Sequence, residues 1–255
     1  MEVKALKFGG LTAKRPIVQG GMGVGVSLSS LAGNVAKCGG VGTISGVHPG
    51  YREADFKENP FRANLRAIGN ELEKAKEIAS GGIIGFNFMT VMNHYEEYVK
   101  EAIAAGADFI VSGAGLPANL AKYAAGTRAA ILPIVSSARA LKLIVKQWQR
   151  ADRLPDAVVV EGPLAGGPLG YPYGHLVDGT FDTLEDSLVD VVDYVQELEE
   201  KNGVKIPVVA GGGVRNHADM ERLMALGASG VQVGTKFVAT EECDAAPAFK
   251  QAYLR

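Results

Sequence analysis

The sequence predicts an α/β fold, a closed (β/α)8 TIM barrel that forms one domain over residues 1–255. The chain has 255 residues, 47% of them hydrophobic and 21% charged, so it can bury one large core. Eight short, continuously apolar runs, typical of strands buried on both faces, alternate with longer amphipathic stretches. Eight strand–helix units in a chain of this length favour a barrel over an open Rossmann sheet.

The predicted strands are the eight apolar runs, and each predicted helix follows a strand and has apolar residues at helical spacing. The strands are Pro16–Gln19, Val41–Ile44, Ile83–Asn87, Phe109–Val111, Ala130–Val135, Ala157–Glu161, Val208–Ala210 and Gly230–Val233. The helices are Leu28–Cys38, Pro60–Ile78, Met92–Ala105, Leu116–Ala125, Ser137–Gln149, Thr183–Lys201, Asn216–Leu226 and a last stretch from about Ala245 toward Arg255. Glycine after Cys38, Ala105 and Leu226 supplies the left-handed residue that ends many helices.

Two connections are longer than a minimal repeat needs. Gly46–Asn59 follows the second predicted strand, and Pro163–Asp182 follows the sixth. In a barrel, these loops lie on the carboxyl face, where active sites are built, so both are candidate walls of a substrate site. The alternative is that they are surface excursions only.

Charge and cysteine content narrow the class of protein. Lys and Arg number 26 and Asp and Glu 28, a formal charge of −2 that offers no general attraction for nucleic acid or an anionic membrane. No apolar run has the length of a membrane span, and the first residues lack the apolar core of a secretory signal. Cys38, expected in the core, and Cys243, expected to be partly exposed, form no disulfide framework and no metal-ligand cluster. We therefore expect a cytoplasmic protein with a small-molecule substrate and no metal.

Glycine is the residue in excess. It occupies 33 of 255 positions, nearly twice the usual share of about 7%. The seventh predicted strand runs into Gly211, Gly212 and Gly213 before a helix that begins at Asn216, and the eighth runs into Gly234 and Thr235. Bare amides at such turns can hold a phosphate, and the loops after strands seven and eight often share one. The alternative is that these glycines serve tight turns alone.

A further glycine cluster, Gln19–Gly25, closes the first strand. Its spacing resembles a dinucleotide fingerprint, but the second strand ends in Thr43-Ile44-Ser45 and supplies no acidic residue for a ribose. We interpret the glycines as room for a flat ring across the barrel mouth, with Met22 packed on it. A flexible turn is the alternative.

Eight motifs occur in the order found in one known family. They are Gln19–Met22, Leu31–Gly33 through Cys38–Gly42, Gly85–Met89, Ser112–Pro117, Val135–Ala138, Glu161–Gly167, Ala210–Gly213 and Val233–Phe237. In this order they resemble the nitronate monooxygenase family, formerly the 2-nitropropane dioxygenases, which includes the FMN-dependent enoyl-acyl carrier protein reductases. The resemblance covers essentially the whole chain.

The resemblance implies an FMN-binding TIM barrel and assigns residues to the cofactor. Gly21 and Met22 would border the flavin ring, Asn87 would hydrogen-bond near it, and Ser136 is a candidate contact at its edge. The other edge would be lined by Glu161, Ala165, Gly166 and Gly167, and the 5′-phosphate would be held by Gly211, Gly212, Gly213, Gly234 and Thr235. A strand-end cap for Asn87 and a solvated or salt-bridged carboxylate for Glu161 are the alternatives.

The sequence departs from the family in two places. Family members usually have histidine after Gly-Gly in the sixth connection, where this chain has Pro168, which can neither accept a proton nor donate a backbone hydrogen bond. His175 in the same connection is a candidate substitute, and His48 is a more remote one. Family members also commonly continue past Glu241–Asp244 and the helix after it, so this chain is expected to lack part of the C-terminal portion that helps cover the site.

The resemblance implies a function with alternatives. The first is an FMN-dependent oxidoreductase that oxidises small nitronates with O2. The second is an NAD(P)H-dependent enoyl-thioester or flavin reductase, since hydride transfer to or from a flavin needs no side-chain base. The third is a non-enzymatic flavin-binding protein, because of Pro168. Whether the chain forms a homodimer is left open.

Overall fold

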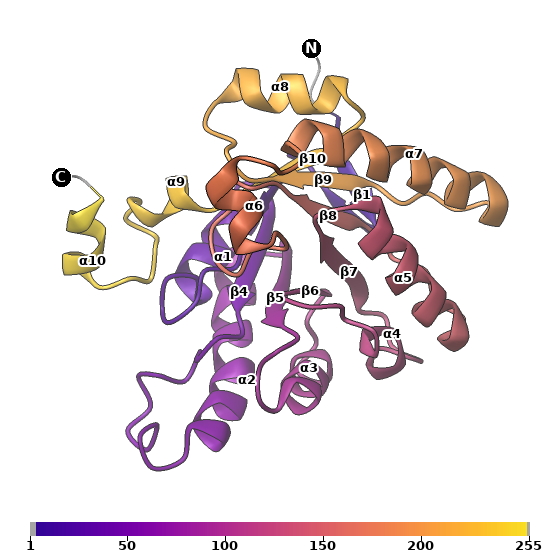
Figure 1. The fold of residues 1–255 in the computed structure, drawn as a ribbon. Helices are drawn as coiled ribbons and strands as arrows, with labels where there is room; N and C mark the ends of the chain where they lie inside the picture. The colour runs from indigo at the N-terminus through magenta and orange to yellow at the C-terminus, as the bar shows by residue number, and fades with distance from the viewer. Residues whose placement is uncertain (1–3, 254–255) are drawn as a thin grey trace.

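The structure is a computed structural model that describes residues 4–253, and it shows a closed barrel of eight parallel strands surrounded by helices (Figure 1). The order around the barrel is β10-β3-β4-β5-β6-β7-β8-β9. The bounds are β3 (Ile17–Gln19), β4 (Val41–Ser45), β5 (Ile83–Met89), β6 (Phe109–Gly113), β7 (Ala130–Val135), β8 (Val158–Glu161), β9 (Val208–Gly211) and β10 (Gly230–Val233). Each of the eight predicted strands overlaps one of these, so the predicted fold is confirmed.

The barrel closes where the last strand pairs with the first. Val231 on β10 lies opposite Ile17 on β3, and on its other side β10 pairs with β9 in parallel register. The long helices α1 (Ser29–Lys37), α2 (Pro60–Ala79), α3 (Tyr95–Ala104), α5 (Ala138–Trp148), α7 (Leu184–Asn202) and α8 (His217–Ala225) surround the barrel (Figure 1). The glycine ends predicted for α1, α3 and α8 are confirmed, since Gly39, Gly106 and Gly227 all have positive φ angles.

The hydrophobic core has two parts, as the pattern of continuously apolar strands requires. One cluster lies between barrel and helices and includes Phe86, Phe88 and Trp148, all fully buried. The other fills the barrel and includes Val41, Phe109 and Val159. Trp148 packs in the first cluster, and its indole N–H donates to the Pro117 carbonyl at 2.8 Å.

An antiparallel hairpin before the barrel was not predicted. It consists of β1 (Leu6–Phe8) and β2 (Leu11–Ala13), joined through Gly9 and Gly10, which both have positive φ angles. Leu6, Phe8 and Ala13 belong to the same buried cluster as the barrel interior. The hairpin therefore supplies apolar side chains to the amino-terminal end of the barrel.

Helices differ from the predicted ones mainly in the connections. The predicted helix Leu116–Ala125 is reduced to α4 (Leu120–Tyr123): Leu116 and Pro117 have no regular structure, and turns precede and follow the helix. The connection 163–182 contains a short helix, α6 (Tyr173–Asp178), and another, α9 (Thr235–Val238), follows β10; neither was predicted. The last predicted helix is present as α10 (Pro247–Ala252). Leu254 and Arg255, at the end of the last predicted helix, lie outside the described residues.

Both expectations for the cysteines were wrong. Cys38 is exposed, and it follows the last residue of α1 instead of lying within the helix. Cys243 is buried, because the chain after β10 folds back onto the β3–α1 loop, and Cys243 packs there with Val26 and Val238.

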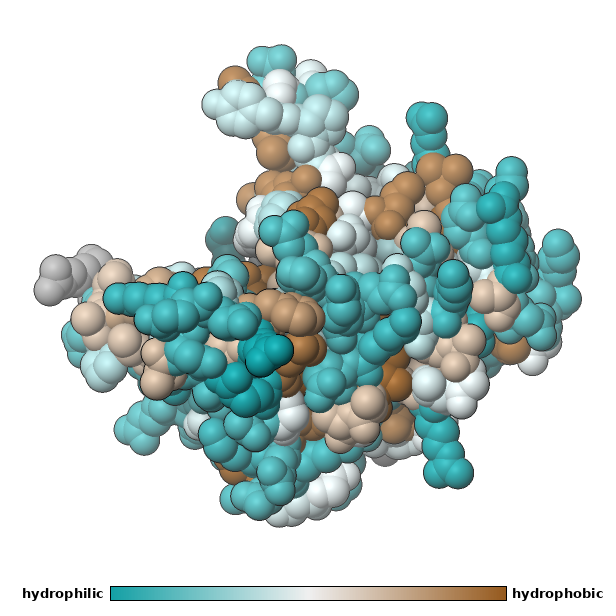
Figure 2. Space-filling model, turned by 90° about the horizontal axis from the view of Figure 1, so that it is seen from below, coloured by the Kyte–Doolittle hydropathy of each residue, from teal (hydrophilic) through white to brown (hydrophobic). Residues whose placement is uncertain are grey.

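Most of the visible surface is hydrophilic, with separate apolar patches on the face seen from below (Figure 2). Among residues 4–253, no helix has both the length and the apolar character that crossing a bilayer requires.

We expect Asn216→Ala to lower the free energy of unfolding by about 1 kcal/mol, since it removes the side-chain cap of α8. The Asn216 side chain accepts a hydrogen bond from the Asp219 N–H at 3.0 Å, and the Asp219 carboxylate bonds back to the Asn216 N–H at 3.2 Å. Urea denaturation would measure the loss. His217→Ala is the control, because His217 is exposed in the first turn of the same helix; equal losses in both variants would contradict the capping role.

Candidate functional site

The candidate site lies at the carboxyl ends of the barrel strands, where side chains two residues apart along a strand share the inner face. Val159 on β8 and Val209 on β9 belong to the barrel interior, so Glu161 and Gly211, two residues further on, face inward at the mouth. The register places them side by side: Glu161 pairs with Gly211, and Gly211 with Gln232 on β10. The strands thus gather one carboxyl and one amide at the mouth.

Glu161 and Gln232 form a hydrogen-bonded pair. The Gln232 Nε2 donates to Glu161 Oε1 at 3.0 Å. Burial raises the pKa of Glu161 above its ordinary value, and the bond from Gln232 only partly opposes this. Cβ atoms placed on Gly20 and Gly211 would lie 3.5 Å and 3.2 Å from Gln232 side-chain atoms, so small residues leave it room. Gln232 was missed at the sequence level, although it directly precedes the Val233-Gly234-Thr235 motif.

Gly21 and Asn87 are also brought together. A Cβ on Gly21 would lie 2.5 Å from the Cβ of Asn87, closer than any side chain permits, so only glycine fits here. The Asn87 side chain is partly buried at the end region of β5 and donates to the Val111 carbonyl at 3.4 Å. One wall of the mouth is therefore a bare backbone packed against an amide side chain.

The turns after β9 and β10 are adjacent and rich in free donors. None of the intramolecular hydrogen bonds found among residues 4–253 uses the backbone N–H groups of Gly212, Gly213, Gly234 or Thr235. Gly212 and Gly213 have φ angles of +105° and +78°. The Sδ atom of Met22 would lie 3.6 Å from a Cβ on Gly234. Four unpaired N–H groups on neighbouring turns, with no side chains in the way, fit an anionic group such as a phosphate.

The 163–182 connection borders these turns. A Cβ on Gly212 would lie 2.9 Å from the backbone nitrogen of Ala165, so Ala165 adjoins the second glycine of the turn. Gly166 and Gly167 are exposed, and no atom beyond their chain neighbours would lie within 4 Å of a Cβ on either. Ser136 donates to the Gly170 carbonyl at 3.1 Å, and Tyr171 donates to the Glu161 carbonyl at 3.3 Å. Ser136 thus anchors this connection beside the mouth.

At position 168, where family members usually have histidine, this chain has no titratable side chain. Pro168 is exposed. His175 is exposed on α6, and no side-chain hydrogen bond or ion pair is found for it within residues 4–253. His48 is exposed with a positive φ angle and packs edge-on against Phe56, at 5.4 Å between ring centroids. The structure brings neither histidine to the Glu161–Gln232 pair.

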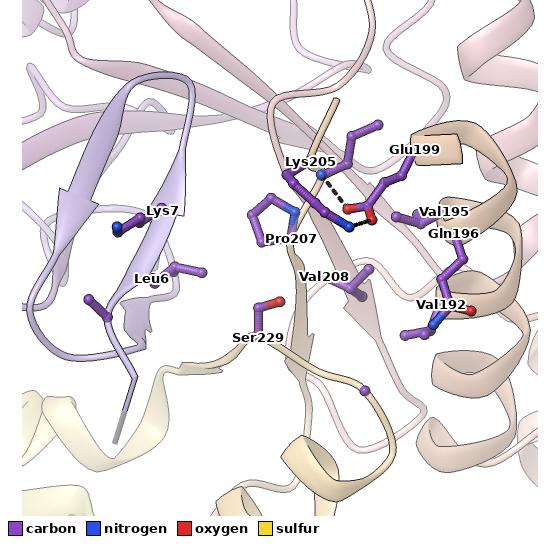
Figure 3. A pocket seen from close by; sticks show the side chains of 13 residues that line it. Leu6, Lys7, Val192, Val195, Gln196, Glu199, Lys205, Pro207, Val208 and Ser229 are labelled. Atoms are coloured by element: carbon purple, nitrogen blue, oxygen red, sulfur yellow. Dashed lines mark hydrogen bonds and ion pairs between the residues drawn. The ribbon is translucent and has the colours of Figure 1, made fainter. Parts of the chain in front are cut away.

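A cavity of about 370 Å³ lies at the other end of the barrel (Figure 3). It is bordered by Leu6 on the hairpin, by Val195 and Glu199 on α7, and by Pro207 and Ser229, which precede β9 and β10. Its most polar feature, Glu199, is used by the fold itself: it accepts hydrogen bonds from Lys205 Nζ and from the Ile206 N–H. Functional groups at the carboxyl ends therefore outweigh this cavity as the candidate site.

Comparison with known proteins agrees with the family resemblance of the sequence motifs. The profile of the nitronate monooxygenase family matches residues 4–255. A probable nitronate monooxygenase of Staphylococcus saprophyticus is 25% identical over 99% of this chain and 73% of its own length. An octahydroindene-carboxyl-CoA dehydrogenase of Rhodococcus jostii is 26% identical over 94% of this chain and 57% of its own length.

Solved structures share the fold. FabK from Thermotoga maritima superposes with a TM-score of 0.71 at 26% identity, over 94% of this chain and 64% of that chain. A nitroalkane oxidase from Streptomyces ansochromogenes has a TM-score of 0.67 at 22% identity, over 93% of this chain and 70% of that chain. With a family profile matched along nearly its whole length and a barrel of the same architecture, this chain belongs to the nitronate monooxygenase family of flavin oxidoreductases.

Proposed function

We propose that this protein is an FMN-dependent oxidoreductase that oxidises small nitronates with O2. The observation that carries the proposal is the set of unpaired N–H groups on Gly212, Gly213, Gly234 and Thr235, next to a mouth lined by glycine. Such a site suits a ligand with an anionic tail and a flat ring, which is the shape of FMN. Its partners would be small molecules, with no nucleic acid or membrane involved.

Different residues of the chain would bind different parts of the cofactor. The four N–H groups would bind the 5′-phosphate, while Gly21, Met22 and Asn87 would border one side of the ring. Glu161, Ala165, Gly166 and Gly167 would border another, with Ser136 at the edge. FMN, when bound, supplies the two-electron redox chemistry between substrate and O2, and the protein supplies binding, orientation and electrostatics.

Pro168 favours a nitronate over its parent nitroalkane as substrate. A nitroalkane must lose a proton from carbon before it can be oxidised as a nitronate, and Pro168 cannot accept that proton. A nitronate is already deprotonated, so its oxidation requires no base at this position. Glu161, whose pKa is raised by burial, is the titratable side chain that the inner strand faces bring to the mouth.

A second candidate is an NAD(P)H-dependent enoyl-thioester reductase. It is favoured by exposed apolar side chains on the connections at the carboxyl face, Val24, Leu164, Tyr173 and Val177, which would suit an acyl chain. The relative from Rhodococcus jostii, named for a CoA thioester, supports the same class.

Anaerobic stopped-flow mixing separates the two candidates. The FMN-loaded protein is mixed in turn with a small nitronate and with NADH or NADPH, and the visible absorbance of oxidised flavin is followed. Bleaching by the nitronate alone is expected for the proposed function, whereas bleaching by a reduced nicotinamide supports the second candidate. Pro168→His serves as the comparison variant: if only this variant reacts, the natural chain is a flavin-binding protein rather than an enzyme.

A further inference from the structure

The chain after β10 folds back onto a loop near the amino terminus, the β3–α1 loop. Residues 239–246, here the return segment, lie against the β3–α1 loop, residues 20–28. Asp244 Oδ2 accepts hydrogen bonds from the backbone N–H groups of Leu28 at 2.9 Å and Leu31 at 3.0 Å, and Oδ1 accepts one from Ser30 at 3.1 Å. The residue before α1, Leu28, has no side chain that can cap the helix, so Asp244 caps it from 216 positions away.

Apolar contacts accompany these hydrogen bonds. Cys243 and Ala245, on either side of Asp244, are buried with Val26 and Val238, and Met22 packs against this group. The Cys243 thiol and the Asp244 N–H both donate to the Val26 carbonyl, at 3.4 Å and 3.3 Å. The return segment therefore holds the middle and the end of the β3–α1 loop.

Within the β3–α1 loop, hydrogen bonds connect Ser27 to Met22. The Met22 N–H donates to Ser27 Oγ at 3.1 Å, and the Ser27 N–H donates to the Met22 carbonyl at 3.0 Å. Ser27 is fully buried, and its carbonyl accepts the Ser45 N–H on β4. A shift at residues 26–28 is thus transmitted to Met22, whose sulfur lies beside Gly234 in the turn with free N–H groups.

A third loop joins the contact. Arg52, between β4 and α2, donates to the Asp244 carbonyl and to the hydroxyl of Tyr51. The ring of Tyr51 would lie 2.4 Å from a Cβ on Gly25, so it packs directly on the β3–α1 loop. The other charged group here is Glu71 on α2, which accepts the Ser29 N–H at 3.0 Å. The return segment and both loops therefore meet at Asp244, which binds the β3–α1 loop through its carboxylate and Arg52 through its backbone carbonyl.

We propose that Asp244 is a positioning residue for the cofactor site, which holds the β3–α1 loop and Met22 against the phosphate-binding turn before the cofactor arrives. This inference rests on the proposed FMN site. A loop that is already ordered spares the ligand the entropic cost of ordering it, so affinity is higher. Asp244 touches neither the turn nor the mouth, and its effect passes through Val26, Ser27 and Met22.

FMN titration of three variants tests the inference. Asp244→Ala is expected to raise the Kd for FMN about tenfold, because it removes three hydrogen bonds to a charged acceptor. Asp244→Asn keeps one carbonyl oxygen and is expected to have a smaller effect. Glu242→Gln is the matched control, since it removes a neighbouring exposed carboxylate and should bind FMN like the natural chain.

Hydrogen exchange of the Leu28, Ser30 and Leu31 amides provides the second measurement. In the natural chain FMN should slow their exchange, because tighter loop order and FMN binding are coupled in both directions. In folded Asp244→Ala or Asp244→Asn these amides should exchange faster without FMN. If the natural chain binds FMN and both Asp244 variants bind it within twofold, the inference is overturned. If the natural chain binds no FMN, the proposed function fails, and unchanged exchange of these amides in Asp244→Asn would overturn the positioning role separately.

Discussion

Gly212→Ala is expected to weaken FMN binding by at least about tenfold and to destabilise the fold by about 1–3 kcal/mol. Gly212 has a φ angle of +105°, which a residue with a Cβ adopts only under strain. The new Cβ would lie 2.9 Å from the nitrogen of Ala165 and 3.3 Å from that of Gly162. The turn must therefore move, and its free N–H groups move with it. Calorimetric titration with FMN and thermal unfolding would measure the two effects.

Gly203→Ala separates backbone strain from the site. Gly203 ends α7 with a φ angle of +65°. Apart from its chain neighbours, no atom would lie within 4 Å of a Cβ placed there. This variant should lose about 1–2 kcal/mol of stability from the left-handed conformation and keep its FMN affinity. FMN binding by Gly212→Ala with the affinity of the natural chain would refute the proposed phosphate site.

Glu161→Gln is expected to raise the melting temperature of the flavin-free protein at pH 8 and to leave it unchanged near pH 4. Burial raises the pKa of Glu161, so folding favours the protonated form. The stability that this group contributes is present below its ordinary pKa of 4.5 and is lost as the pH rises through the raised value. Glutamine stays neutral and still accepts the hydrogen bond from Gln232, so it avoids the loss.

The expected rise in melting temperature depends on how far burial raises the pKa of Glu161. Each unit by which the pKa is raised corresponds to about 1.4 kcal/mol, and 1 kcal/mol shifts the melting temperature of a domain of this size by about 2–4 °C. Melting curves from pH 4 to pH 8 would measure it. Glu200→Gln, an exposed position on α7, should show no such dependence. A constant difference between Glu161→Gln and the natural chain at every pH would contradict the burial of the carboxylate.

Much of the barrel could be predicted because its signals are local. Continuous apolar runs mark β4, β7 and the other barrel strands, and glycines with positive φ angles mark the helix ends. The hairpin β1–β2 escaped prediction because its strands have three residues each, too few to show a period. Cys38 was misplaced because the helical pattern cannot tell the last helical residue from the first one beyond it.

The site could be predicted in part for the same reason. Gly211, Gly212 and Gly213 stand directly after an apolar run, and so does Gly234, so the sequence pointed to the two glycine turns at which we propose that a phosphate binds. Gln232 was missed because its role depends on Glu161, which lies on another strand. Asp244 was missed because a carboxylate that caps a helix 216 residues earlier leaves no trace in its own neighbourhood.

The pairing of β10 with β3 has a consequence for biosynthesis. Val231 finds Ile17 only after more than 200 residues have been made, and Asp244 reaches α1 later still. Contacts between such distant positions form slowly. A nascent chain that has not yet released β10 from the ribosome cannot seal its barrel, and one that has not yet released residue 244 lacks the anchor of its first loop. Cofactor capture should therefore follow the emergence of β10, and ribosome-bound chains arrested before this strand emerges should not retain flavin.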